Sequence, residues 1–232
     1  MRFITLAGEI IDGRRLTAAD PELSELITGD LEEMAEGADR IRQSLCGDRV
    51  DLCSIVNGRG GKCSENCKFC AQSAHHRARC LEYGFLDKDE FVRDCGRMAA
   101  KGVDRYSIVT AGRTLEGRDL EKAIESYQAM HAAWPDMILC ASHGLVTEDA
   151  LRRMRKAGVS MYHTNVETSE RFFPQICTTH TYADKKEQIR RAKAAGMTVC
   201  SGGILGMGET WQDRIDMALL LAEMEIDSIP LC

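Results

Sequence analysis

Short apolar runs alternate with longer amphipathic stretches along most of this chain. The runs have the length of β-strands and cover residues 51–57, 105–112, 137–144, 161–168, 198–206 and 228–232. After each of the first five runs, apolar residues recur at helical spacing. Strands that alternate with helices in this way predict a parallel sheet with the helices outside it.

The first 45 residues have a different pattern, which predicts helices only. Residues 17–27 begin with a threonine suited to capping a helix, followed by acidic residues. Residues 29–45 carry a helical stripe of apolar side chains, formed by Leu31, Met34, Ala38, Ile41 and Leu45. We expect these helices to form an N-terminal extension, residues 1–45, that closes one end of a core formed by residues 46–232.

The alternating part of the chain predicts a (β/α) barrel of the TIM type, with about six βα units. A complete barrel of this type needs further units, so the sequence predicts a partial barrel and a C-terminally truncated fragment. An incomplete parallel sheet exposes an unpaired edge strand, and we therefore expect poor solubility or a homodimer. The reactive face of such a barrel lies at the carboxyl ends of its strands.

Three cysteines follow the first predicted strand, in the run GKCSENCKFCAQS. Cys63, Cys67 and Cys70 have Cys-x3-Cys-x2-Cys spacing, which suits three corners of a 4Fe-4S cluster whose fourth iron stays open for chemistry. A structural zinc site is the alternative, but it needs four ligands and usually two pairs at two-residue spacing. The spacing therefore favours an iron–sulfur centre.

Composition narrows the class of protein. The 232 residues include 11 cysteines, with no apolar leader and no long uncharged span, which indicates thiols kept for metal in a cytoplasmic protein without membrane helices. With 44% hydrophobic residues, the chain can bury one sizeable core. The net charge of −6 gives no electrostatic reason to expect a nucleic-acid partner.

The cysteine triplet resembles that of the radical S-adenosylmethionine enzymes. From about Cys46 onward, the strings NGRGGKCSENCKFCAQSAHH, YHTNVETS and CSGGILGMGET resemble the biotin synthase family in particular. The resemblance implies that the cluster, reduced by a donor such as flavodoxin or ferredoxin, cleaves S-adenosylmethionine to a 5′-deoxyadenosyl radical. It also implies dethiobiotin as the substrate and a second cluster, 2Fe-2S in the family, as the sulfur donor.

The same resemblance implies a pocket for S-adenosylmethionine. Phe69, beside the third cysteine, is expected near the adenosine, while Asn165 and Glu167 are expected to face the substrate and the ribose hydroxyls. Lys185 stands where the family has an arginine for the methionyl carboxylate. The motif GGILGMGE is implied to contact the adenine, and its candidate residues are Gly203 and Ile204.

The sulfur-donating cluster departs from the family pattern. Cys140 and Cys200 match two of its ligands, but Ser107 stands where the third cysteine is expected. Cys46 and Cys53 have no counterpart in that pattern, and Cys53 lies within a strand like Cys140 and Cys200. We hypothesise an auxiliary cluster rebuilt on Cys46, Cys53, Cys140 and Cys200. Ordinary buried thiols are the alternative, since free cysteine is often only packed.

Two histidines end predicted strands on the expected reactive face. They are His143 and His163, and substrate contacts are expected at such positions.

Other functions stay open at this point. A hydrogenase maturase or a methylornithine synthase shares the triplet and the barrel, but neither accounts as well for Cys140 and Cys200. A non-catalytic iron–sulfur or zinc-binding module would use the thiols without the predicted pocket for S-adenosylmethionine.

Overall fold

A five-stranded parallel sheet forms the centre of the protein. The computed structural model describes residues 2–232, and its strands follow one another across the sheet in the order of the sequence. They are β1 (Cys53–Arg59), β2 (Arg105–Thr110), β3 (Ile138–Ser142), β4 (Val159–His163) and β5 (Thr198–Cys200). The sixth predicted run adds only single parallel bridges, Ser228 to Cys200 and Leu231 to Gly203. The predicted partial barrel is confirmed.

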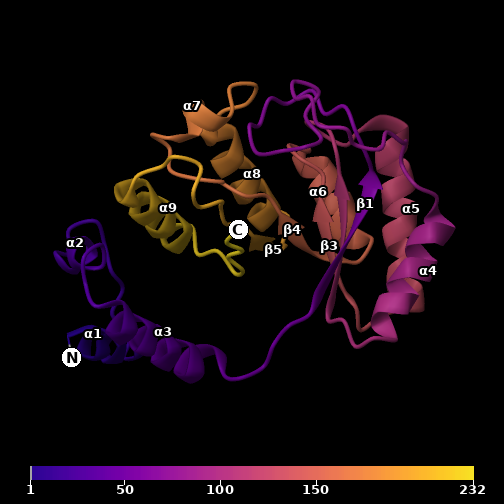
Figure 1. Ribbon diagram of the computed structural model, residues 1–232. Coiled ribbons are helices and arrows are strands. Elements are labelled where there is room, and N and C mark those ends of the chain that lie inside the picture. Colours follow the sequence, from indigo (N-terminus) through magenta and orange to yellow (C-terminus); the bar gives the residue numbers. More distant parts are fainter. Residues whose placement is uncertain (1) are drawn as a thin grey trace.

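A helix follows each strand, as the sequence predicts, and these helices flank the outer side of the curved sheet (Figure 1). They are α4 (Lys88–Ala99), α5 (Gly117–Ala133), α6 (Glu148–Lys156), α8 (Tyr182–Ala194) and α9 (Trp211–Glu223). A capping box begins α4, α8 and α9 and satisfies free backbone N–H groups there. A one-turn helix between β4 and α8, α7 (Phe173–Ile176), was not predicted.

Alternate residues of each strand face opposite sides of the sheet, which gives the sheet two different faces. The outer face packs against the helices through fully buried side chains, among them Tyr106, Ile108, Leu139, Tyr162 and Val199. The inner face is more open, and Ile55 on β1 is 67% exposed. Polar and sulfur-bearing side chains therefore occupy the interior of an incompletely closed barrel.

The N-terminal helices pack on each other. They are α1 (Arg2–Ile11), α2 (Glu22–Glu25) and α3 (Leu31–Cys46), and α3 confirms the helix predicted over 29–45. The helix predicted over 17–27 is wrong except for the single turn of α2. Thr17 donates its N–H and hydroxyl to Asp20 Oδ2 at 2.7 and 2.8 Å, and Pro21 follows, so this stretch forms a turn.

The N-terminal helices lie beyond the sheet, and their closure of one end of the barrel stays a prediction. Figure 1 shows α1–α3 to one side of the sheet, joined to β1 by residues 47–52. Only part of the apolar stripe on α3 is covered by α1, because Leu31 and Leu45 are exposed. A division of the chain at about residue 45 stays a prediction.

Among residues 2–232, no helix combines the length and the apolar character that a crossing of a lipid bilayer requires.

The segment after β5 lies tightly against the last residues of the chain. Gly203 donates its N–H to the Pro230 carbonyl at 3.1 Å, and Ser201 donates to the Ser228 carbonyl at 2.9 Å. A Cβ on Gly202 would lie only 1.8 Å from the Pro230 oxygen. Glycine at this position therefore allows residues 228–232 to bridge to the sheet.

We predict that Gly202→Ala lowers the free energy of unfolding by about 1–3 kcal/mol, because the added methyl group must displace backbone. Urea denaturation of the two proteins measures the difference. Gly84→Ala is the matched control, since nothing lies within 4 Å of a Cβ there. Equal stability of Gly202→Ala and the parent chain would contradict the close packing of residues 228–232.

Candidate active site

The cysteine triplet lies on a loop that hydrogen bonds fold back on itself just after β1. Cys63 donates its N–H to the Gln72 carbonyl and accepts at its own carbonyl from Ala74, both at 2.8 Å. Cys70 donates to the Cys67 carbonyl at 3.1 Å. The loop thus places three thiols at the carboxyl end of the sheet, which is the reactive face of this kind of barrel.

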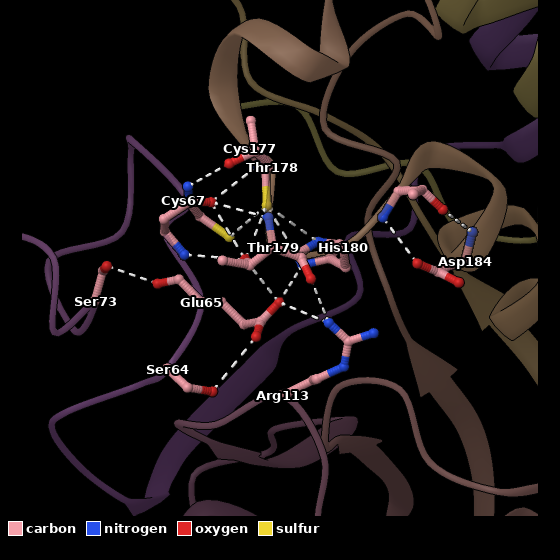
Figure 2. Close-up of polar contacts among 12 residues, drawn as sticks. Ser64, Glu65, Cys67, Ser73, Arg113, Cys177, Thr178, Thr179, His180 and Asp184 are labelled. Carbon is pink, nitrogen blue, oxygen red and sulfur yellow. Dashed lines mark hydrogen bonds and ion pairs between the residues drawn. The ribbon is translucent and has the colours of Figure 1, made fainter.

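A second loop, between α7 and α8, holds the triplet loop from the other side (Figure 2). The Sγ atoms of Cys67 and Cys177 lie 3.8 Å apart, and His180 Nδ1 lies 3.4 Å from Cys177 Sγ. The donor atoms of these three residues all lie within 4.8 Å of one another. Burial and then the Cys177 thiol raise the pKa of Cys67 to about 12, while the Lys185 charge opposes this change.

A buried carboxylate connects the two loops. Glu65 Oε2 lies 2.5 Å from His180 Nδ1, 2.9 Å from the Thr179 hydroxyl and 3.4 Å from an Arg113 guanidinium nitrogen. Burial acts to raise the pKa of Glu65, but these hydrogen bonds and the Arg113 charge bring it below its usual range. Burial lowers the pKa of His180, so a neutral imidazole donates to a charged carboxylate.

Glu167 lies in a strained and buried position on the same face. Its φ of +71° is in the left-handed region, and its Oε2 atom has no hydrogen-bond partner among the described residues. Burial raises the pKa of this carboxyl, and Asn165 hydrogen-bonds to it. Strain of this kind persists where neighbouring structure enforces it, often at ligand sites. An unpaired carboxylate oxygen suits a ligand that brings hydroxyl groups.

Lys185 is the positive charge among these groups. It is half-buried on α8, and its charge acts on Cys67, Glu167 and His180. Its ammonium group has no ion pair among residues 2–232, and that leaves it available to an anionic ligand.

Phe69 lines an open cleft of about 450 Å³ together with Phe172, Met207 and Gly208. The cleft therefore lies between the triplet loop and the GGILGMGE motif, as expected if both segments line one ligand pocket. Gly203, also in this motif, is needed for a different reason, because a Cβ there would lie 2.5 Å from the Glu167 carbonyl oxygen. Ile204 donates its N–H to that same oxygen at 2.9 Å.

A second group of thiols lies on the inner face of the sheet. Cys53, Cys140 and Cys200 come from β1, β3 and β5, and Cys53 and Cys200 both contribute to the raised pKa of Cys140. Burial raises the pKa of all three thiols, and the Arg105 charge opposes this change at each. Cys46, at the end of α3, is exposed and is not brought to the other three.

The two histidines at strand ends, His143 and His163, have different surroundings. His143 is fully buried, with Nδ1 3.0 Å from the Thr110 hydroxyl and Nε2 2.8 Å from the Tyr127 hydroxyl, so it has no free nitrogen for a substrate. Burial lowers its pKa to about 3. His163 Nδ1 lies 3.2 Å from Cys200 Sγ and belongs to the inner thiol group.

Sequence reasoning missed several residues of the site. Glu65, Arg113, Cys177 and His180 contact one another or Cys67, but no candidate role was predicted for them. The signal was the Cys-x2-His pair in ICTTHTY, placed after the fourth strand where reactive groups of a barrel gather.

The residues present fit a 4Fe-4S cluster with S-adenosylmethionine. One loop supplies three sulfur donors. Glu167 offers an orphaned buried oxygen, and Lys185, whose charge acts on both Cys67 and Glu167, offers an unpaired cation.

Comparison with known proteins shows the family of this chain. The Radical SAM superfamily matches residues 59–221. A biotin synthase of Alkaliphilus metalliredigens is 58% identical over 97% of this chain and 70% of its own length. The chain belongs to the biotin synthase family. A biotin synthase of Clostridium beijerinckii is 55% identical over 97% of this chain and 71% of its own length. This biotin synthase homologue is accordingly an enzyme, a radical S-adenosylmethionine sulfurtransferase.

Solved structures support the fold of this biotin synthase homologue. Methylornithine synthase has a TM-score of 0.83 at 19% identity, over 98% of this chain and 67% of that chain. A maturase of the [FeFe]-hydrogenase has a TM-score of 0.80 at 16% identity, over 99% of this chain and 53% of that chain. These two enzymes are the alternatives that the sequence analysis named within the superfamily. At identities of 19% and 16%, the structural similarity shows a shared fold alone.

We predict that Glu65→Gln destabilises the apoprotein by about 2 kcal/mol at pH 7, because buried hydrogen bonds to a charged group are lost. The folded pKa of Glu65 lies below its unfolded value of about 4.3, so its contribution is present above that value and is lost as the pH falls through the folded pKa. Urea denaturation at pH 7 and below pH 4 measures the change.

The matched control for Glu65→Gln is Glu82→Gln. Glu82 is exposed and pairs only across 3.2 Å with Lys62, so its effect is expected within about 1 kcal/mol. A Glu65→Gln variant as stable as Glu82→Gln at pH 7 would overturn the role of Glu65 in joining the two loops.

Proposed function

We propose that this chain inserts sulfur into dethiobiotin to form biotin, with a radical centre on the triplet loop and a sulfur source on the inner face of the sheet. The observation that carries this proposal is the placement of Cys53, Cys140 and Cys200 on three strands, β1, β3 and β5, with their side chains on the inner face of the sheet. Radical chemistry alone does not need these thiols. A sulfur-donating cluster does, since its irons are held by cysteine thiolates.

In this proposal, Cys63, Cys67 and Cys70 hold the 4Fe-4S cluster. When bound, the cluster and S-adenosylmethionine supply a 5′-deoxyadenosyl radical that removes hydrogen from unactivated carbons of dethiobiotin, at C9 and C6. The protein contributes position and shielding. The Glu65–His180 pair fixes the loop that carries Cys67, and it thereby fixes where the radical would form.

The groups around the triplet loop would bind S-adenosylmethionine. Lys185 would neutralise the methionyl carboxylate, Asn165 and Glu167 would accept or donate hydrogen bonds at the ribose and the substrate, and Phe69 would pack beside the adenosine. The support is the unpaired oxygen of Glu167, the unpaired ammonium of Lys185 and the cleft beside Phe69.

The auxiliary cluster would be held by Cys53, Cys140 and Cys200, with Cys46 as the fourth ligand. Cys46 lies beyond the segment 47–52, which is exposed throughout and would have to fold inward to bring it to the others. Ser107 pairs in register with Cys140 and is buried next to it, so it lines the site without a thiol.

We further propose a cytoplasmic enzyme that takes its electrons from a flavodoxin or ferredoxin and forms a homodimer. The support for the dimer is the exposed apolar residues on or beside β1, including Leu52 and Ile55.

Alanine variants of Cys53, Cys140 and Cys200 test the function. After anaerobic reconstitution with iron and sulfide, we expect each variant to retain about four irons per chain, those of the triplet cluster. Given reductant, S-adenosylmethionine and dethiobiotin, each variant is expected to form 5′-deoxyadenosine but no biotin, because only the sulfur source is lost.

Cys95→Ala is the matched control, because Cys95 is fully buried in α4, among the side chains that pack the outer layer. It is expected to keep the full iron content and both products. Variants of the three inner thiols that keep their full iron content and still form biotin would refute the proposed sulfur source.

A further inference from the structure

Arg105 occupies an unusual place for a cation, on the inner face of the sheet. It begins β2, where its Cα pairs with that of Cys53 on β1. Its neighbours along the strand, Tyr106 and Ile108, face the outer helices, so alternation directs Arg105 and Ser107 inward. The side chain is three-quarters buried, although it carries a permanent charge.

The guanidinium group of Arg105 reaches across the interior. One of its terminal nitrogens lies 3.8 Å from the sulfur of Met161 on β4. Since neighbouring strands lie about 4.8 Å apart, β2 and β4 are separated by roughly 10 Å. The guanidinium therefore passes over β3, where Cys140 pairs in register with Met161.

Its hydrogen bonds leave the Nε donor free. The other terminal nitrogen donates to Asp51 Oδ2 at 2.9 Å, which anchors the side chain from the segment just before β1. The Nε atom is buried and has no partner among the described residues. A buried N–H without an acceptor is costly, and it commonly marks a place where a ligand supplies one.

We propose that Arg105 is a positioning residue for an anionic iron–sulfur ligand in the barrel interior, to which its Nε–H donates a hydrogen bond and whose negative charge it balances. This inference rests on the proposed function and adds a group that neither the cysteine pattern nor the family resemblance assigned in this sequence. Thiolates and bridging sulfides carry several negative charges into a poorly solvated space, where a fixed guanidinium stabilises them. Hydrogen bonds and net charge near such a cluster also set its reduction potential.

The test uses a background that cannot hold the triplet cluster, with Cys63, Cys67 and Cys70 all changed to alanine. Reconstituted iron then reports on the inner site alone. In this background we compare the parent protein with Arg105→Met, Arg105→Lys and Arg49→Met. Arg49 is the matched control, because it pairs with the same Asp51 but is exposed.

Arg105→Met is expected to lose iron to a chelator roughly tenfold more readily than the parent, a usual effect of removing a group that supports metal ligands. Its remaining cluster is expected to have a more negative reduction potential, because a nearby positive charge is lost. Arg105→Lys keeps the charge and should restore most of the potential. Arg49→Met should match the parent in both measurements.

A purely structural role for Arg105 predicts a different result. Arg105→Met would then lower the stability of the apoprotein but leave the reduction potential of the inner cluster unchanged, and this outcome would overturn the inference. If the parent background binds no iron at all, the proposed function fails and the inference fails with it. Iron in the parent with unchanged retention and potential in Arg105→Met would overturn the inference alone.

Discussion

The parallel register of the five strands is the constraint on which both candidate centres depend. In a parallel sheet, a shift of one residue would turn every inner side chain outward. The observed register directs Tyr106, Leu139 and Val199 into the helical layer and leaves their neighbours Arg105, Cys140 and Cys200 inside. The hydrophobic outer face therefore fixes the positions of the inner thiols, although it never contacts a ligand.

The two centres are also connected electrostatically through β4 and α8. The charge of Lys185 acts on Cys67 beside the triplet and on His163, whose imidazole lies 3.2 Å from the Cys200 thiol. Burial lowers the pKa of His163 to about 4, so this residue adds no charge near neutral pH. A neutral imidazole and one ammonium group thus lie between the two groups of sulfur atoms. The cation near the triplet is Lys185, and the cation near the inner thiols is Arg105.

Much of this arrangement could be predicted from the sequence. The alternating apolar runs predicted the parallel sheet and its helices, because burial on one face imposes a period that is visible in the residues themselves. The spacing of Cys63, Cys67 and Cys70 predicted their common loop, since all three lie within one short segment.

Contacts between distant segments were beyond the sequence alone. Nothing near Glu65 indicates that His180 lies 2.5 Å away, because the two residues meet only after β4 and α7 are placed. From the sequence alone, Arg105 resembles an ordinary charged residue at the start of a strand. Only the strand register shows that its side chain faces inward. The turn at Thr17 was mistaken for a helix start, since the same Thr and Asp residues serve both structures.

We propose above all that the inner thiols hold the sulfur that enters the product. The most direct measurement loads the protein anaerobically with ³⁴S-sulfide, removes free sulfide, and follows a single turnover with S-adenosylmethionine and dethiobiotin by mass spectrometry. Our account predicts biotin that carries ³⁴S, in an amount no greater than that of the protein-bound sulfide. Biotin without the label, or 5′-deoxyadenosine with no biotin at all, would contradict it.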